Sequence, residues 1–351
     1  MKKSFRLFLG LSFFFSLSAL AVPDQDFQKV YDLLEHGQGS FYRQGAFQGT
    51  GGVRIAYTRF GGRQKGIHGS IVIAPGRTES SLKYTEVAYD LIDQGFSPIY
   101  VLDHRGQGFS ERLLSDPQKG YIPDYAVYEN DFSAFVQLVL KDKSVDRKNL
   151  FLLSHSMGGA IVTEYLMNLK EASPFRAAAF ISPMYKIADK RSEAELIRDT
   201  GYACYLLFQC KDYIPDGGPF RWENRHFENN DLTHSLLRFR FRDHLWKTRP
   251  QLQLGDPTIR WVRESVQADI RIRDITKLSR LRLPFLIFQG TQDTVTDAQG
   301  AVEVCRRMKS PCTRLLVKGA RHEILMETQN LRSAALKRVE NFFKRPLRKG
   351  L

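Results

Sequence analysis

Apolar segments of strand length alternate with segments of helical spacing over most of the chain. The first half predicts strands at residues 53–60, 70–74, 97–102, 150–154 and 177–181, with helices at 82–94, 127–142 and 159–169. The last part resumes this alternation, with strands at 285–288 and 314–317 and helices at 298–307 and 331–343. Because such alternation is typical of βαβ units, the sequence predicts an α/β fold built on a mostly parallel sheet.

The alternation stops between residues 184 and 278. This segment contains helical pieces, aromatic and basic residues, and the turn sequence PDGGP at residues 215–219. A segment of this kind inside an α/β fold predicts a largely helical cap, inserted over the carboxyl edge of the sheet. We therefore expect a core in two parts, residues 22–183 and 279–351, with the cap between them and a basic tail at the end.

Residues 1–21 have the pattern of a secretory signal peptide. Three basic residues precede an uncharged, mostly apolar run at residues 7–20. This run is short against the ~20 residues that cross a bilayer. Ala19 and Ala21 supply the small-x-small pattern that signal peptidase recognises. We expect an exported protein, periplasmic or secreted, and an uncleaved N-terminal anchor is the alternative.

The four cysteines form two pairs that are close in sequence: Cys204 with Cys210, and Cys305 with Cys312. In an oxidising compartment these positions predict two short disulfide loops, and four buried thiols are the alternative. The chain has no C-x-x-C motif and no histidine cluster near the cysteines. We therefore expect no metal site and no cofactor.

The formal net charge is +14, and its excess is concentrated near the end of the chain. Residues 331–351 carry seven basic residues and one acid, Glu340. This charge predicts peripheral contact with an anionic membrane surface, and a solvated basic helix end is an equal alternative. No nucleic-acid-binding motif accompanies the charge, so nucleic acid is not an expected partner. Nothing in the sequence indicates an obligate protein partner.

The stretch LLSHSMGGA, residues 152–160, has the features of a nucleophile elbow, in which a serine sits on a sharp turn between a strand and a helix. Small residues must stand two positions before and after the nucleophile. Around Ser156 these positions are Ser154 and Gly158, both small. A nucleophile at Ser154 would still lie inside the strand. Ser156 is therefore the candidate, with Ser154 in a position where glycine is usual.

A serine hydroxyl needs a base to become a good nucleophile, and the base needs an orienting acid. After a nucleophile elbow the expected chain order is serine, acid, histidine. His322 is the one histidine that follows the cap, and Asp293 lies in the loop after the strand at 285–288. Asp297 is the alternative acid, although its position before a helix is typical of an N-cap. The predicted triad is Ser156, Asp293 and His322.

Two backbone N–H groups should stabilise the oxyanion that forms during acyl transfer. One is expected from Met157, directly after the nucleophile. The other is expected from Arg77, in the Pro-Gly-Arg loop that follows the strand at 70–74. The Arg77 guanidinium could also bind a phosphate, and a surface position or a structural salt bridge is an equal alternative.

Several motifs resemble one known family. HSMGG, IAPGRTES, DHRGQGFS and GARHEILME are similar to the α/β-hydrolases related to monoacylglycerol lipase. The Pro-Gly-Arg loop and the segments NNDLTHS (229–235) and LQLGDPTIRWVRES (252–265) resemble the bacterial lysophospholipase L2 branch more closely. The resemblance runs from about residue 47 to residue 343. DHRGQGFS itself reads as a structural turn.

The resemblance implies hydrolysis of the single acyl ester of a lysophospholipid, with the triad and oxyanion donors named above. Five cap residues could line the substrate pocket or form the cap's own hydrogen-bond network: Asn230, His234, Trp261, Arg263 and Glu264. Two features depart from the family: the signal segment, and the Cys204–Cys210 pair. A monoacylglycerol lipase, another esterase or a peptidase on the same fold remains an alternative, as does a membrane-surface binding protein without activity.

Overall fold

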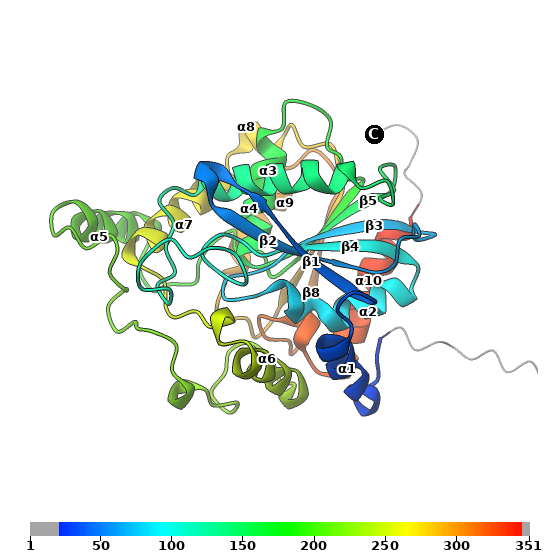
Figure 1. Cartoon of the computed structure of the whole chain (residues 1–351). Helices are drawn as coiled ribbons and strands as arrows, with labels where there is room; N and C mark the ends of the chain where they lie inside the picture. Colours follow the sequence, from blue (N-terminus) through cyan, green and yellow to red (C-terminus); the bar gives the residue numbers. More distant parts are fainter. Residues whose placement is uncertain (1–20, 346–351) are drawn as a thin grey trace, which may run out of the picture.

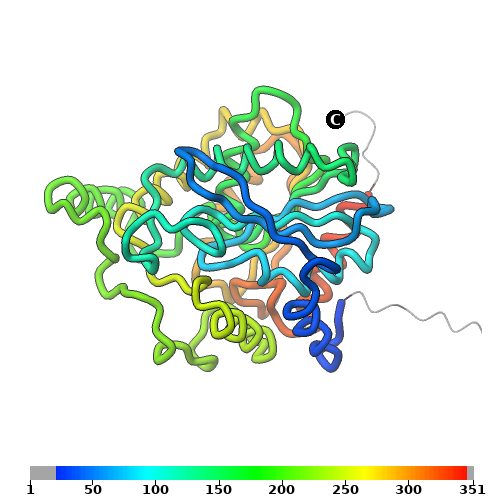
Figure 2. Tube along the Cα trace, in the orientation of Figure 1, coloured from blue at the N-terminus to red at the C-terminus, as the bar shows by residue number. Residues whose placement is uncertain are grey.

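A computed structural model describes residues 21–345 of the chain (Figures 1 and 2). All but the last residue of the predicted signal peptide, together with the tail residues Arg348 and Lys349, lie outside the described residues. Between residues 21 and 345, no helix has both the length and the apolar character that crossing a membrane requires.

One eight-stranded sheet forms the centre of the molecule, in the order β1-β2-β4-β3-β5-β6-β7-β8. Its strands are β1 (Tyr42–Gln48), β2 (Arg54–Phe60), β3 (Gly69–Ala74), β4 (Phe96–Leu102), β5 (Leu150–His155), β6 (Ala177–Ile181), β7 (Phe285–Gly290) and β8 (Cys312–Val317). The six strands from β3 to β8 are parallel, whereas β1 and β2 form an antiparallel edge. The predicted α/β fold with a mostly parallel sheet is confirmed.

Helices cover both faces of this sheet (Figure 1). They are α1 (Gln28–His36), α2 (Thr85–Asp93), α3 (Ala126–Lys141), α4 (Met157–Asn168), α9 (Ala298–Arg307) and α10 (Gln329–Lys344). Alternate strand residues supply the two cores: Val72 and Leu152 pack with α3 and α4, while Ile73 and Leu153 pack with α2 and α10. Because the parallel strands are buried on both faces, they appear in the sequence as continuous apolar runs.

Residues 184–278, predicted as a largely helical cap, contain four α-helices joined by long loops. These helices are α5 (Glu193–Tyr205), α6 (Leu236–Thr248), α7 (Ile259–Ile272) and α8 (Ile275–Leu278). Helix α7 packs against α4 of the core and against α5, which extends away from the sheet (Figure 2). The division of the chain into core and cap remains a prediction.

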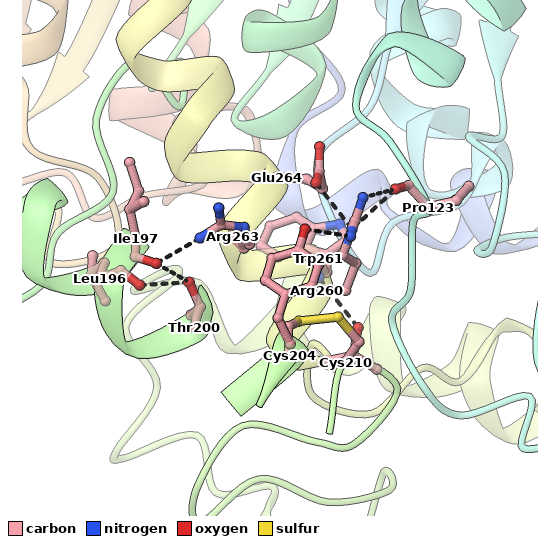
Figure 3. Close-up of a disulfide and its surroundings, with 12 residues drawn as sticks. Pro123, Leu196, Ile197, Thr200, Cys204, Cys210, Arg260, Trp261, Arg263 and Glu264 are labelled. Atoms are coloured by element: carbon pink, nitrogen blue, oxygen red, sulfur yellow. Dashed lines mark hydrogen bonds and ion pairs between the residues drawn. A yellow bond between two sulfur atoms is a disulfide. The ribbon is translucent and has the colours of Figure 1, made fainter. Parts of the chain in front are cut away.

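Short 3-10 helices occupy several connections: η1 (Asp24–Asp26), η2 (Thr50–Gly52), η3 (Ser81–Tyr84), η4 (Trp222–Asn224), η5 (Pro250–Leu252) and η6 (Ile324–Met326). The cysteines are paired as Cys204–Cys210 and Cys305–Cys312. The first disulfide ties the end of α5 to the following loop, and the second joins α9 to the start of β8 (Figure 3 shows the first).

Candidate active site

Ser156 occupies a sharp turn between the end of β5 and the start of α4. Its backbone has φ 49° and ψ −121°, in the left-handed region that residues with a side chain rarely adopt. Gly158 is required here, because a Cβ at this position would lie 2.2 Å from the carbonyl oxygen of Ala74. Ser154 is tolerated where glycine is usual, with a buried hydroxyl that has no hydrogen-bond partner among the described residues.

Ser156, His322 and Asp293 form one hydrogen-bonded chain, although 29 to 166 residues separate them. Ser156 Oγ lies 2.9 Å from His322 Nε2, and His322 Nδ1 lies 2.9 Å from Asp293 Oδ2. Each residue follows the carboxyl end of a parallel strand, so the sheet brings all three to one edge. This geometry orients the imidazole so that Nε2 can accept the serine proton.

The Asp293 carboxylate is held in its charged form. Burial raises its pKa, but the His322 ring and the N–H groups of Thr296 and Val295 outweigh burial and lower the pKa to about 2. Those two N–H groups donate to Oδ1 over 3.1 and 2.9 Å. The alternative acid, Asp297, caps α9 through Gln299 N–H and pairs with Lys186, so it is occupied elsewhere.

The two predicted oxyanion donors are the backbone N–H groups of Met157 and Arg77. Met157 N–H lies at the N-terminus of α4, and Arg77 N–H meets no acceptor among the described residues. Gly76 N–H is already used, because it donates to the Glu79 carboxylate. The Arg77 loop is held by His104, whose Nε2 lies 3.1 Å from Pro75 O, and by Gln107. DHRGQGFS therefore braces the loop that carries Arg77.

The Arg77 guanidinium is buried and makes no ion pair with any carboxylate of residues 21–345. Its Nη2 donates to Gly255 O over 2.6 Å, and its guanidinium faces the Trp261 ring at 5.2 Å. Arg77 Nε is buried with no partner in the described part of the chain. Burial lowers the pKa of this group to about 10, which still leaves it charged at neutral pH.

The remaining cap residues predicted near the substrate are engaged with other parts of the protein. Asn230 folds its own loop, donating to Phe227 O and accepting from Leu232 N–H and Thr233 N–H. His234 Nδ1 lies 2.8 Å from Glu327. Trp261 Nε1 donates to Tyr128. In Figure 3, Arg263 donates to Ile197 O and so joins α7 to α5, whereas Glu264 pairs with Arg260 within α7 itself.

A buried group of charges beside the serine was not anticipated from the sequence. Glu79 contacts Lys83 and lies 3.0 Å from His155 Nδ1, and Glu323 joins Lys83 to Arg242. Burial opposes charging of Glu323, but Lys83 and Arg242 outweigh it and lower its pKa to about 2. The sequence offered one signal for this group, which is that His155 and Glu323 are next to the predicted triad residues Ser156 and His322.

No three histidine, cysteine, aspartate or glutamate side chains of residues 21–345 are grouped to hold a metal ion.

Residues 65–329 match the family described as serine aminopeptidase, S33. The chain is 33% identical over 320 residues to lysophospholipase L2 of Escherichia coli (strain K12), covering 87% of this chain and 89% of the relative. It is 26% identical over 279 residues to monoglyceride lipase of Mus musculus, covering 78% and 81%.

Among solved structures, a soluble variant of monoglyceride lipase from Saccharomyces cerevisiae aligns with a TM-score of 0.67. The identity is 18%, and the alignment covers 87% of this chain and 96% of that chain. Because the family match spans most of the sequence and the lysophospholipase L2 match covers most of both chains, this protein belongs to the serine aminopeptidase S33 family of α/β-hydrolases.

Proposed function

We propose that this hydrolase cleaves the acyl ester of lysophospholipids, with Ser156 as the nucleophile. The observation that carries the proposal is the hydrogen-bonded chain from Ser156 Oγ through His322 to Asp293. The identity to lysophospholipase L2 over most of both chains supports the substrate class. Monoacylglycerol is the second candidate substrate, supported by the more distant monoglyceride lipase match.

The reaction follows from the geometry. Ser156 Oγ attacks the ester carbonyl while His322 Nε2 takes its proton, and the carbonyl oxygen becomes an oxyanion between Arg77 N–H and Met157 N–H. Collapse of this intermediate breaks the ester bond, and His322 gives its proton to the departing glycerol oxygen. Water, deprotonated by His322, then cleaves the acyl-enzyme and releases the fatty acid.

Fatty-acid release by the chain from residue 22 onward, compared with its Ser156→Ala variant, tests the chemistry. We expect release from lysophosphatidylethanolamine and labelling by a fluorophosphonate probe, both absent in the variant because the nucleophile is gone. Labelling that persists in Ser156→Ala would contradict the assignment. A protein that is never labelled would be a binding protein on a hydrolase fold.

The buried Arg77 side chain supports a phosphate-bearing substrate. It is a charged group whose Nε has no partner among the described residues and which makes no direct ion pair there, although the charge of Asp256 raises its pKa; it lies in the loop next to the nucleophile. A substrate phosphate would supply a directly paired countercharge. In a lysophospholipid, the glycerol carbon that carries the phosphate diester lies one or two carbons from the carbon that carries the acyl ester. The ester and the phosphate can therefore reach one site.

Arg77→Met tests this role while leaving the backbone N–H in place. A charge-assisted hydrogen bond contributes about 1.5–3 kcal/mol, so kcat/KM for lysophosphatidylethanolamine should fall roughly 10- to 100-fold. Activity on monoacylglycerol, which lacks phosphate, is the internal control and should change much less. An equal loss on both substrates would mean that Arg77 only holds its loop.

We further propose that the enzyme is exported and works at a membrane surface. The end of α5 exposes five large apolar residues: Tyr202, Tyr205, Leu206, Leu207 and Phe208. Contiguous exposed apolar side chains of this kind are typical of a surface that meets lipid or protein. The basic residues near the C-terminus would add attraction to anionic head groups. Fractionation of cells into cytoplasm, periplasm and membrane tests both parts of this proposal.

A further inference from the structure

The first described residues of the chain dock onto the core. Val22 is buried, and its backbone nitrogen donates a hydrogen bond over 2.8 Å to Oδ1 of Asp90 in α2. Asp90 is only 2% exposed. Its second oxygen, Oδ2, pairs with Arg332 of α10. The backbone nitrogen of residue 22 is therefore fixed against a buried carboxylate.

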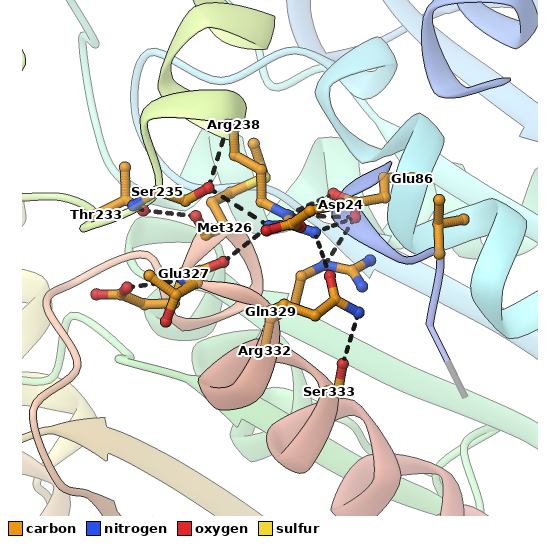
Figure 4. Close-up of polar contacts among 12 residues, drawn as sticks. Asp24, Glu86, Thr233, Ser235, Arg238, Met326, Glu327, Gln329, Arg332 and Ser333 are labelled. Atoms are coloured by element: carbon orange, nitrogen blue, oxygen red, sulfur yellow. Dashed lines mark hydrogen bonds and ion pairs between the residues drawn. The ribbon is translucent and has the colours of Figure 1, made fainter. Parts of the chain in front are cut away.

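Asp90 belongs to a mostly buried network of charged residues (Figure 4 shows most of its members). Arg332 also reaches Glu86, and Arg238 of α6 makes bonds of 2.7 and 2.9 Å to the same carboxylate. Arg238 pairs in addition with Asp24 of η1, at 2.9 Å. The buried part of this network therefore holds two carboxylates, Asp90 and Glu86, and two guanidinium groups, whereas the Asp24 side chain is 46% exposed.

Ala19 and Ala21, the small residues of the predicted cleavage signal, end directly before Val22. We propose that signal peptidase cuts after Ala21 and that the new α-ammonium group of Val22 forms a buried ion pair with Asp90. This inference rests on the export proposed above. Two independent observations concern the Val22 nitrogen. The cleavage signal predicts a cut at the peptide bond that this nitrogen forms with Ala21, and the structure places the nitrogen in hydrogen-bond contact with the Asp90 carboxylate.

The chemistry of the cut places a new positive charge beside Asp90. Water adds across the bond between Ala21 and Val22, leaving a carboxylate on Ala21 and an amine on Val22. The amine takes up a proton, since an α-amino group is mostly protonated at neutral pH. The polar hydrogen bond of the precursor becomes a charged pair, and Asp90 then bridges two cations, Val22 and Arg332.

The mature end would also stabilise the fold. Burial is the main effect that raises the Asp90 pKa, and Arg332 only partly opposes it. A second cation at 2.8 Å favours the carboxylate further, and the carboxylate favours the ammonium. Val22 contacts Asp90 of α2, which pairs with Arg332 of α10, and the charge of Glu86 of α2 also acts on Asp90, so the processed end ties α2 to α10.

A chain beginning at Val22, made with a removable tag whose protease leaves no extra residue, tests the pairing directly. Reductive methylation with ¹³C-formaldehyde lets NMR follow the titration of the Val22 nitrogen. We expect its pKa to lie at least about one unit above the usual range of roughly 7.7–8.0. Asp90→Asn should remove this rise, whereas Asp93→Asn, at an exposed acid on the same helix, should leave it.

Two further chains keep Asp90 intact and change only the end. One retains Ala21, and the other carries an acetylated Val22. Both should have a lower Tm than the free Val22 chain at pH 7. This gap should close as pH rises through the raised pKa of the amine, because an elevated pKa stabilises only the protonated form.

The proposal would be overturned by a Val22 pKa in the ordinary range, by equal Tm values of the three chains, or by intact-mass analysis showing another mature end. Fatty-acid release by the same chains is scored separately. It reports on the proposed lysophospholipid hydrolysis whatever the state of the N-terminus.

Discussion

Ser156 keeps a strained backbone because its neighbours hold it on both sides. Its N–H donates to Ile181 O over 3.0 Å, and its carbonyl accepts from Met184 N–H and Gly159 N–H. A non-glycine residue in such a conformation costs of order 1–3 kcal/mol and persists only where the surrounding structure fixes it. The strain lifts Oγ out of the strand and towards His322.

Asp293→Asn should reduce kcat by roughly 10⁴-fold, because an amide does not hold the imidazole in the tautomer that accepts the serine proton. Its steady-state kinetics on a lysophospholipid provide the measurement. Asp297→Asn is the matched control, since Asp297 caps α9 and pairs with Lys186. Similar losses of kcat in the two variants would mean that Asp293 has been wrongly assigned as the acid of the triad.

The same substitution has a consequence for stability at acid pH. The Asp293 pKa falls from an ordinary value of 3.8 to about 2 in the folded protein. The charged form therefore stabilises the fold above about pH 4, and this contribution is lost as pH falls towards 2. Urea unfolding at several pH values should show wild type losing more stability than Asp293→Asn over that interval.

The candidate triad could be assembled from the sequence because each member follows a recognisable strand at a fixed place in the chain order. Glu79, Lys83 and Arg242 could not be found in this way. Glu79 and Lys83 are four residues apart and pair locally, but Arg242 of α6 joins them only through Glu323 and tertiary packing, so no local pattern reveals the whole group. Arg77 illustrates a third case, in which the sequence located the residue but not the burial of its side chain.

At the scale of elements, the loop at residues 229–235 supports the loop that carries His322. Asp231 O and Leu232 O accept hydrogen bonds from His322 N–H and Glu323 N–H, over 3.5 and 2.9 Å. Thr233 Oγ1 donates to Met326 O over 2.5 Å. Asn230 closes this loop on itself, so its effect on the site is indirect.

Asn230→Ala should therefore lower kcat more than it raises KM, because the His322 loop loses its support while no substrate contact is removed. Each lost hydrogen bond costs about 1 kcal/mol, and Tm should fall as well. Kinetics and thermal unfolding of the variant give the measurement, and Asn229→Ala is the neighbouring control. A rise in KM with kcat unchanged would instead indicate direct substrate binding.

Most core elements were predictable from their periodicity, while β1 and α1 were missed. In β1 only Tyr42 is buried, since this strand pairs with β2 alone and forms the polar edge of the sheet. Helix α1 has only two buried residues, Val30 and Leu34. Amphipathic elements at an edge carry too few apolar positions to stand out in a sequence.

At the scale of the whole molecule, the exposed apolar end of α5 is the surface that we propose contacts a membrane. Phe208 is 88% exposed and Leu206 is 65% exposed, next to the Cys204–Cys210 disulfide. A short covalent loop reduces the freedom of these side chains, so less order would have to be imposed on them in the lipid interface proposed above. The apolar end and the basic C-terminal residues would respond differently to salt.

Replacing Leu206 and Phe208 together by serine should weaken binding to anionic vesicles. Burial of each large apolar side chain contributes about 1.5–3 kcal/mol, so the loss should be at least tenfold in partition. Ile275→Ser, at an exposed apolar residue of α8, is the control. Vesicle co-sedimentation gives the measurement.

Salt separates the two modes of attachment. At about 0.5 M salt, screening over roughly 4 Å should remove the part of binding that depends on the basic C-terminal residues and leave the part due to α5. Binding unaffected by salt would exclude the basic tail as an anchor. Binding unaffected by the serine replacements would exclude α5.

Residues 184–278 separate β6 from β7 in the sequence. This separation determines which parts of the fold can form first during synthesis. Strand β6 ends at Ile181, but its partner β7 begins only at Phe285, and Asp293 and His322 come later still. Pairing across so long a separation is slow and cannot begin until the last strands are made. The sheet is therefore completed and the candidate triad assembled at the same late stage, and a translation product that ends before residue 322 lacks His322.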